Sequence, residues 1–204
     1  MHLLPRGQAR SGGAVMEAVR LNVPGAGDDI LALRAGERVL LSGTVYTARD
    51  AAHRRMVELM ERGETLPFEL SGAAIYYCGP APAPPGMAIG AAGPTTSGRM
   101  DAYAPKLIAR GLRVMIGKGP RSQAVLDAMR EHGAVYLAAA GGAGALLASR
   151  ITDCELIAWP ELGPEAVRRL TVRDMPLTVA ADAHGGNLYV TGPAAYLEGS
   201  AAKG

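Results

Sequence analysis

Three cationic side chains occupy positions where the chain passes from an extended segment into a turn or a helix. Arg49 and Arg99 fall in the first turns of two predicted helices, and Lys118 lies between two glycines. A helix start carries a partial positive charge and free N–H groups, so an Arg there costs about a few tenths of a kcal/mol. Any one of the three fits a solvated surface charge equally well. Together they predict a site for an anionic ligand.

The segment Gly93–Met100 is a second candidate for chemistry. It resembles the phosphate-binding pattern G-x-x-x-x-G-K-[ST], but Arg99 replaces the Lys and Met100 replaces the hydroxyl residue that holds magnesium. Both changes fall on positions that the chemistry requires. A stand-alone phosphate- or nucleotide-binding module that uses the Gly93–Arg99 loop therefore remains an alternative.

Other reactive residue types have simpler structural roles. Thr95 and Thr96 precede a predicted helix, where capping of backbone N–H groups is the simplest function, although a capping Thr can also face a ligand. We expect Cys78 to be a small buried hydrophobic residue and not a nucleophile. The acidic neighbours of Cys154 oppose thiolate formation. No metal site is predicted from His53, His132, His184 and the two separate cysteines.

Composition limits the class of protein. The 204 residues have a mass of 21.1 kDa and a net charge of +2, with both signs interspersed, so we expect one domain and no nucleic-acid or anionic-membrane surface. The uncharged stretch Leu70–Gly98 is broken by prolines and predicts no membrane helix. The N-terminus lacks a signal-peptide pattern and the cysteines are few, so we expect a cytoplasmic protein.

The elements that must position these residues alternate along the chain. Thr47 and Asp50 match a capping box, which predicts a helix that ends at Gly63. A long Pro- and Gly-rich loop, 79–94, leads through Thr95 and Thr96 to a helix that has Arg99 in its first turn and ends at Gly111. Further strands are predicted at 39–41, 73–78, 113–116, 134–138, 155–159, 177–181 and 187–191, with helices at 121–132 and from Pro164.

This alternation predicts an α/β fold with a mixed or partly parallel sheet. We expect a single compact domain over residues 19–193, with tails at 1–18 and 194–204.

Five segments carry a family resemblance that spans residues 20–192. The chain resembles the β subunit, or C-terminal domain, of the iron-sulfur class I fumarase and tartrate dehydratase family. The segments are Ser42–His53, Gly79–Pro80, Gly93–Asp101, Gly117–Gly119 and Trp159–Gly163, and the nine-residue run Gly93–Asp101 around Thr95 is specific enough that chance is a poor explanation.

The resemblance implies a swivelling β/β/α domain and reversible addition of water across the double bond of a dicarboxylate. It implies that Arg49, Arg99 and Lys118 hold the substrate carboxylates, which suits the charge-assisted and bidentate contacts that Arg makes. It also implies that Thr95 transfers a proton at carbon. Because a Thr hydroxyl is a weak base, that role requires a neighbouring group to stabilise its alkoxide.

The resemblance also implies a cofactor and a partner. The family's [4Fe-4S] cluster is bound by the α subunit and not by this chain, which predicts an α2β2 assembly. Fumarate hydratase is favoured over a tartrate or related dicarboxylate dehydratase by Gly98 beside Arg99 and by Arg121–Gln123. A subunit retained for assembly, with no chemistry of its own, is a further alternative.

Overall fold

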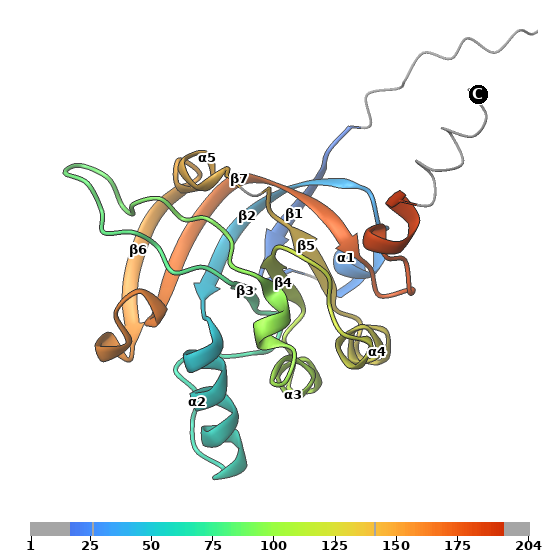
Figure 1. The fold of residues 1–204 in the computed structure, drawn as a ribbon, viewed down its shortest axis with the longest axis horizontal. Helices are drawn as coiled ribbons and strands as arrows, with labels where there is room; N and C mark the ends of the chain where they lie inside the picture. The colour runs from blue at the N-terminus through green and yellow to red at the C-terminus, as the bar shows by residue number, and fades with distance from the viewer. Residues whose placement is uncertain (1–16, 26, 141, 194–204) are drawn as a thin grey trace, which may run out of the picture.

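The fold is built around one sheet that closes on itself. The computed structural model describes residues 17–25, 27–140 and 142–193, and most of both predicted tails lies outside these residues. The strand order is β1-β2-β3-β4-β5-β7-β6, and an additional pairing of β2 with β7 closes the sheet into a barrel (Figure 1). The mixed α/β fold predicted from the sequence is confirmed.

Four consecutive strands of the barrel run parallel. They are β2 (Arg38–Thr47), β3 (Ala74–Tyr76), β4 (Val114–Gly117) and β5 (Val135–Ala138). The long strand β7 (Val167–Ala181) runs antiparallel to both β5 and β2 and completes the ring. β1 (Val19–Val23) adds parallel to β2, and β6 (Ile151–Ala158) adds antiparallel to β7.

Helices α2 (Asp50–Glu61), α3 (Ala104–Ala109) and α4 (Gln123–His132) cover the outside of the parallel strands (Figure 1). In α4 the side chains of Val125, Ala128 and Met129 are buried at helical spacing, and Gly133 ends the helix in the left-handed conformation. The shorter elements are α1 (Gly27–Ala32), α5 (Gly144–Ala148) and the 3-10 helices η1 (Ser97–Met100) and η2 (Pro160–Glu165).

The sheet separates two hydrophobic cores. The barrel core fills the inside of the ring and includes Leu41, Val45, Ile116, Leu137 and Leu170. The helix-layer core lies between the sheet and helices α2 to α4, and it includes Met56, Tyr77, Met115, Met129 and Tyr136. Small and aliphatic side chains dominate both cores, as the low aromatic content predicts.

Two predictions around the candidate residues are wrong. Thr47 does not cap α2, because pairing with β7 extends β2 as far as this residue. The Thr47 hydroxyl instead donates to Ala166 O at 3.2 Å and accepts from the N–H of Arg168 at 3.0 Å. The single helix predicted after Thr95 is two elements, η1 and α3, joined by a turn.

Two predictions near the C-terminal end also fail. Residues 187–191 are not a strand: Asn187 forms one bridge with Ala181, and residues 188–193 are helical. The helix predicted to begin at Pro164 begins at Pro160 as η2, and Gly163 interrupts it with a non-helical conformation. Among the described residues no helix is both long enough and apolar enough to cross a membrane.

Candidate active site

The predicted site residues gather at one edge of the sheet. Since β2, β3 and β4 run parallel, their carboxyl ends lie at the same edge, and Arg49, Gly79 and Lys118 follow those ends. The long loop after β3 returns to this edge, where Pro94 bridges to Cys78 and Thr96 bridges to Lys118. Chain segments distant in sequence are therefore joined there by backbone contacts.

Arg49 is the N-cap residue of α2, and its side chain lies along the surface of the site. Its Nη2 is 3.0 Å from Glu165 Oε1, and its Nε is 3.8 Å from Asp50 Oδ1. A Cβ atom added at Gly79 would lie 3.1 Å from Arg49 Nη1, so the glycine leaves room for the guanidinium group. The side chain is only 20% exposed, which limits the number of positions that it can adopt.

Asp50 connects Arg49 with Arg99. Arg99 Nη2 lies 2.7 Å from Asp50 Oδ2, while Arg49 approaches the other oxygen of the same carboxylate. Arg49 Nε and Asp50 Oδ1 are both buried, and neither has a hydrogen-bond partner within the described part of the chain. The guanidinium groups thus converge on one carboxylate and retain unused donor capacity, which suits a carboxylate ligand.

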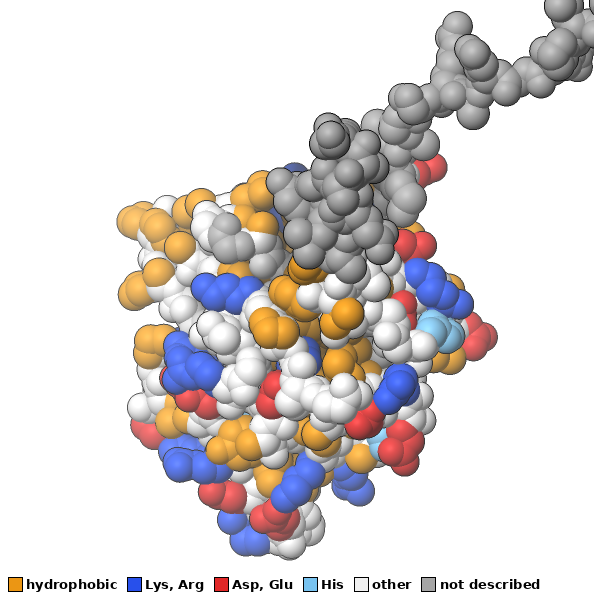
Figure 2. All heavy atoms as spheres, turned by 45° about the vertical axis from the view of Figure 1, so that its right-hand side comes forward, with side chains coloured by type: hydrophobic (Ala, Val, Ile, Leu, Met, Phe, Trp, Pro, Cys, Tyr) orange, Lys and Arg blue, Asp and Glu red, His pale blue; other side chains and the backbone are white. Residues whose placement is uncertain are grey.

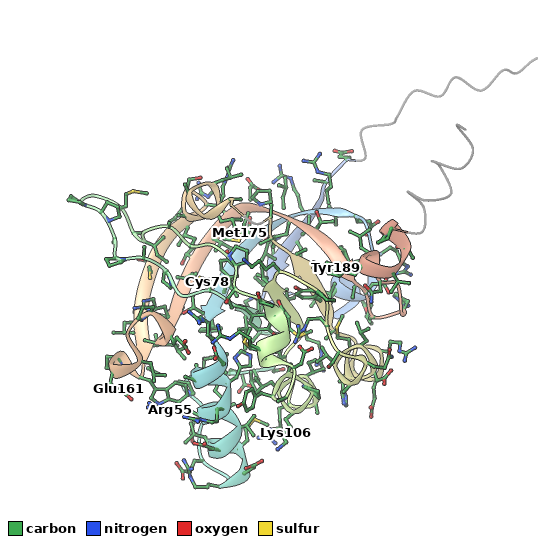
Figure 3. All side chains as sticks on the ribbon, in the orientation of Figure 1. Arg55, Cys78, Lys106, Glu161, Met175 and Tyr189 are labelled. Carbon is green, nitrogen blue, oxygen red and sulfur yellow. The ribbon has the colours of Figure 1, made fainter. Side chains whose placement is uncertain are left out.

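Two ion pairs, Arg49–Glu165 and Arg55–Glu161, attach η2 to the start and first turns of α2. Arg55 of α2 pairs with Glu161 of η2, and the two side chains lie side by side in Figure 3. The Arg55 guanidinium also lies 5.6 Å from the centre of the Trp159 ring. Glu165 Oε2 accepts a hydrogen bond from the N–H of Ala51 at 3.3 Å, so it also pairs one of the free backbone N–H groups at the start of α2.

Thr95 lies between the ends of β3 and β4. Its N–H donates to Tyr77 O at 2.7 Å, and the residue is partly buried. Two residues later, the N–H of Ser97 donates to Lys118 O at 2.9 Å. Thr95 is therefore held in an extended segment at the sheet edge.

Lys118 is exposed at the turn after β4. Among the described residues its ammonium group has no carboxylate within ion-pair distance. Its neighbour Gly119 donates its N–H to the Tyr189 hydroxyl at 2.9 Å, and Tyr189 lies on the helical segment after β7 (Figure 3). No sequence pattern indicates this contact, which spans 70 residues.

The described histidines and cysteines do not cluster as metal ligands would. No group of three His, Cys, Asp or Glu residues that could hold a metal ion occurs within the described residues. Burial raises the pKa of the Cys78 thiol to about 12, which keeps it neutral. Burial lowers the pKa of His53 to about 4, and its Nδ1 lies 2.9 Å from Arg49 O.

Cavity size does not locate the site. A cavity of about 620 Å³ lies between the C-terminal end of α2 and α3, and none of the four predicted site residues lines it. A smaller hollow of about 170 Å³, lined by Asp50, Ala51, Arg54 and Tyr103, borders the Asp50 carboxylate. On the face shown in Figure 2, basic and acidic side chains are interspersed, so the local arrangement of cations matters more than any broad field.

Comparison with known proteins identifies the relatives of this chain. A family model described as the fumarase C-terminus matches residues 2–192. The chain is 41% identical over 179 residues to the aerobic class I fumarate hydratase of Escherichia coli K12, an alignment that covers 85% of this chain and 33% of that protein. It is 44% identical over 156 residues to fumarate hydratase 2 of Leishmania major, covering 76% of this chain and 28% of the relative.

A further relative matches this chain over most of its own length. The putative L(+)-tartrate dehydratase subunit beta of Methanocaldococcus jannaschii is 38% identical over 167 residues, covering 79% of this chain and 86% of that protein. This chain therefore spans about a third of the length of the fumarate hydratases that it matches and most of the length of a protein named as a subunit. The chain belongs to the fumarase C-terminus family.

Proposed function

We propose that this chain is the β subunit of a two-subunit hydro-lyase that adds water to fumarate to give malate. One observation carries the proposal. Arg49 and Arg99 converge on the Asp50 carboxylate at the sheet edge where Thr95 is held, in a chain 41% identical to a fumarate hydratase. Fumarate has two carboxylates, and guanidinium groups bind such groups through charge-assisted contacts.

In this proposal Arg49, Arg99 and Lys118 bind the two substrate carboxylates. A substrate carboxylate would replace Asp50 on Arg99 or use the free Nε of Arg49, and Lys118 would supply a further cation from the opposite side of the Thr95 segment. Thr95 would move the proton at one carbon while the hydroxyl group forms at the other. A swivelling movement of this β/β/α domain relative to its partner would admit the substrate.

The iron-sulfur cluster belongs to the partner subunit in this proposal. The described residues of this chain do not suit a cluster, because they contain no group of three metal-binding side chains and Cys78 is a buried neutral thiol. The alignment supports a partner, since the fumarate hydratases are about three times as long as the matched region. We therefore propose an α2β2 assembly of this chain with a cluster-bearing α subunit.

Tartrate or a related dicarboxylate is a second candidate substrate. It is favoured by the match that covers 86% of a protein named as a tartrate dehydratase subunit. The nucleotide-binding alternative has less support, because Met100 is fully buried and η1 is a 3-10 helix of four residues. The loop therefore lacks both the metal-binding hydroxyl and the long helix of a phosphate-binding site.

The experiment that tests the proposal uses the full chain with and without its partner. The two chains are co-expressed, reconstituted anaerobically with iron and sulfide, and assayed with fumarate, L-tartrate and mesaconate. We expect malate to form from fumarate only when both chains are present. Arg99→Gln should abolish the activity, whereas Arg62→Gln, an equal charge change at the far end of α2, should not.

Two outcomes would overturn the proposal. The first is hydration of fumarate by this chain alone. The second is binding of ATP with magnesium by the isolated chain, measured by titration calorimetry, with no activity in the reconstituted pair.

A further inference from the structure

A buried cation lies directly beneath the candidate site. The side chain of Arg121 has no exposed surface, and its Nε lies 2.7 Å from Asp101 Oδ1. Burying an ion pair costs desolvation energy that a pair of hydrophobic side chains would not incur. Stability alone therefore does not account for the buried Arg121, and its role must be sought in the residues that it contacts.

Arg121 packs between two tyrosine rings. Its guanidinium carbon lies 5.2 Å from the centre of the Tyr77 ring and 5.0 Å from the centre of the Tyr136 ring. Both distances suit cation–π contacts, which gain strength when water is excluded. The Arg121 side chain thus fixes the position of Tyr77, which follows β3, and of Tyr136, which lies on β5.

Each of the two tyrosines holds part of the candidate site. The backbone oxygen of Tyr77 accepts from the N–H of Thr95 at 2.7 Å. The Tyr136 hydroxyl donates to Gly119 O at 2.9 Å, so its 2.8 Å contact with Ser97 Oγ uses the Ser proton. Thr95 on one side and the Lys118 turn on the other are therefore fixed through these two rings.

Two further contacts tighten the same assembly. A Cβ atom at Gly117 would lie 2.1 Å from Ser97 Oγ, so only glycine leaves room for this hydroxyl. Asp101 accepts the N–H of Ser122 at 2.6 Å through its second oxygen, which joins the end of η1 to the start of α4. A change in the position of Arg121 would therefore be transmitted to both candidate segments.

We infer that Arg121 is a positioning residue that sets the separation of Thr95 and Lys118 without touching the substrate. The expected effect on catalysis rests on the proposed function, but the contacts of Arg121 can be tested without it. The matched control is Arg130 of α4, which forms an exposed ion pair with Asp127 and, within the described residues, no hydrogen bond or ion pair with Thr95, Ser97 or Gly119.

The first measurement is amide hydrogen exchange in the full chain without its partner. In Arg121→Met, the amides of Thr95, Ser97 and Gly119 should exchange at least about tenfold faster, while the ladder amides of β2 and β7 remain unchanged. Arg130→Met should change neither group. An equal rise in exchange across the whole sheet, or no change at the three amides, would overturn the inference.

The second measurement is the separation of kcat from KM in the reconstituted two-subunit enzyme. A misplacement on the order of 1 Å at the reacting atoms costs about 100-fold, so kcat should fall by about that factor in Arg121→Met with KM changed by less than about threefold. Faster local exchange with unchanged kcat would remove Thr95 from the reaction and would overturn the proposed function, not the contact network.

A second variant covers the case in which Arg121→Met does not fold. Arg121→Lys retains the charge and the aliphatic stem but loses the planar group that stacks on both rings. It should show the same local exchange pattern and an intermediate loss of kcat. Wild-type exchange at Thr95, Ser97 and Gly119 in this folded variant would contradict the inference.

Discussion

The two cores of the molecule differ in how they treat polar groups. The barrel core is a cluster of apolar side chains in which Leu41, Val45 and Leu170 have no exposed surface. In the helix layer, the polar side chains of His53, Ser97 and Arg121 are buried beside the apolar side chains of the core. Buried polar groups are costly, so their concentration beneath one edge of the sheet marks the region where position matters more than stability.

The comparison assigns a separate task to each region. The barrel core joins β2, β7 and the parallel strands and supplies much of the burial that stabilises the fold. The helix-layer side orients the loops that follow β2, β3 and β4. Changes in the barrel should therefore alter stability with little effect on kinetics, whereas changes beneath the loops should also alter kinetics.

The largest effect is expected from Thr95→Ala. If Thr95 transfers a proton at carbon, kcat of the reconstituted enzyme should fall about 1000-fold with KM nearly unchanged. Thr96→Ala is the matched control, because Thr96 is the adjacent residue and is exposed. Steady-state kinetics test this prediction, and equal small effects from both variants would reduce Thr95 to a structural residue.

The barrel side should respond in stability. Leu41→Ala removes a fully buried side chain and should lower the free energy of unfolding by about 3 kcal/mol through lost burial and a residual cavity. Urea unfolding followed by circular dichroism measures the change. A fall in kcat of the folded variant as large as that in Thr95→Ala would contradict the separate roles of the two cores.

A pH titration distinguishes the polar region from the barrel. The pKa of His53 is lowered from 6.5 to about 4 by burial, so between these values the unfolded chain binds a proton that the folded chain excludes. Stability should therefore fall as the pH drops through this window, by up to about 3 kcal/mol from this residue. His53→Gln should show a shallower decline in urea unfolding; identical pH profiles would assign the loss to other groups.

The smallest effect is expected from Arg99→Lys. Lysine retains the charge but cannot form the paired contacts of a guanidinium group, so KM for fumarate should rise about tenfold with kcat less affected. The Arg99 side chain is half exposed, and its pair with Asp50 contributes little to folding. Thermal unfolding should thus match the wild-type chain, and a large loss of stability would place Arg99 with the structural residues.

Local signals predicted the parallel half of the fold well. The helix that ends at Gly133 has regular apolar spacing and a glycine stop, and short apolar runs correctly predicted β3, β4 and β5. Such signals depend on neighbouring residues, so they survive without knowledge of the tertiary structure. The placement of Arg49 and Lys118 at strand ends follows from the same pattern.

Pairing between distant segments accounts for the failures. Thr47 carries a capping signal, but its pairing with Arg168 on β7 keeps it in a strand. The sequence does not indicate that β7 runs through Asp174, which adopts a positive φ of 47°, and Pro176 to close the barrel. The contacts of Arg121 with Tyr77 and Tyr136 likewise bring together three separate segments, and no spacing rule links them.

The hydrogen bond from Gly119 to Tyr189 extends the influence of the last described helix to the Lys118 turn. A truncation before Tyr189 would leave that amide without its acceptor. Loss of the last described helix should therefore loosen the Lys118 turn even though the two segments lie 70 residues apart.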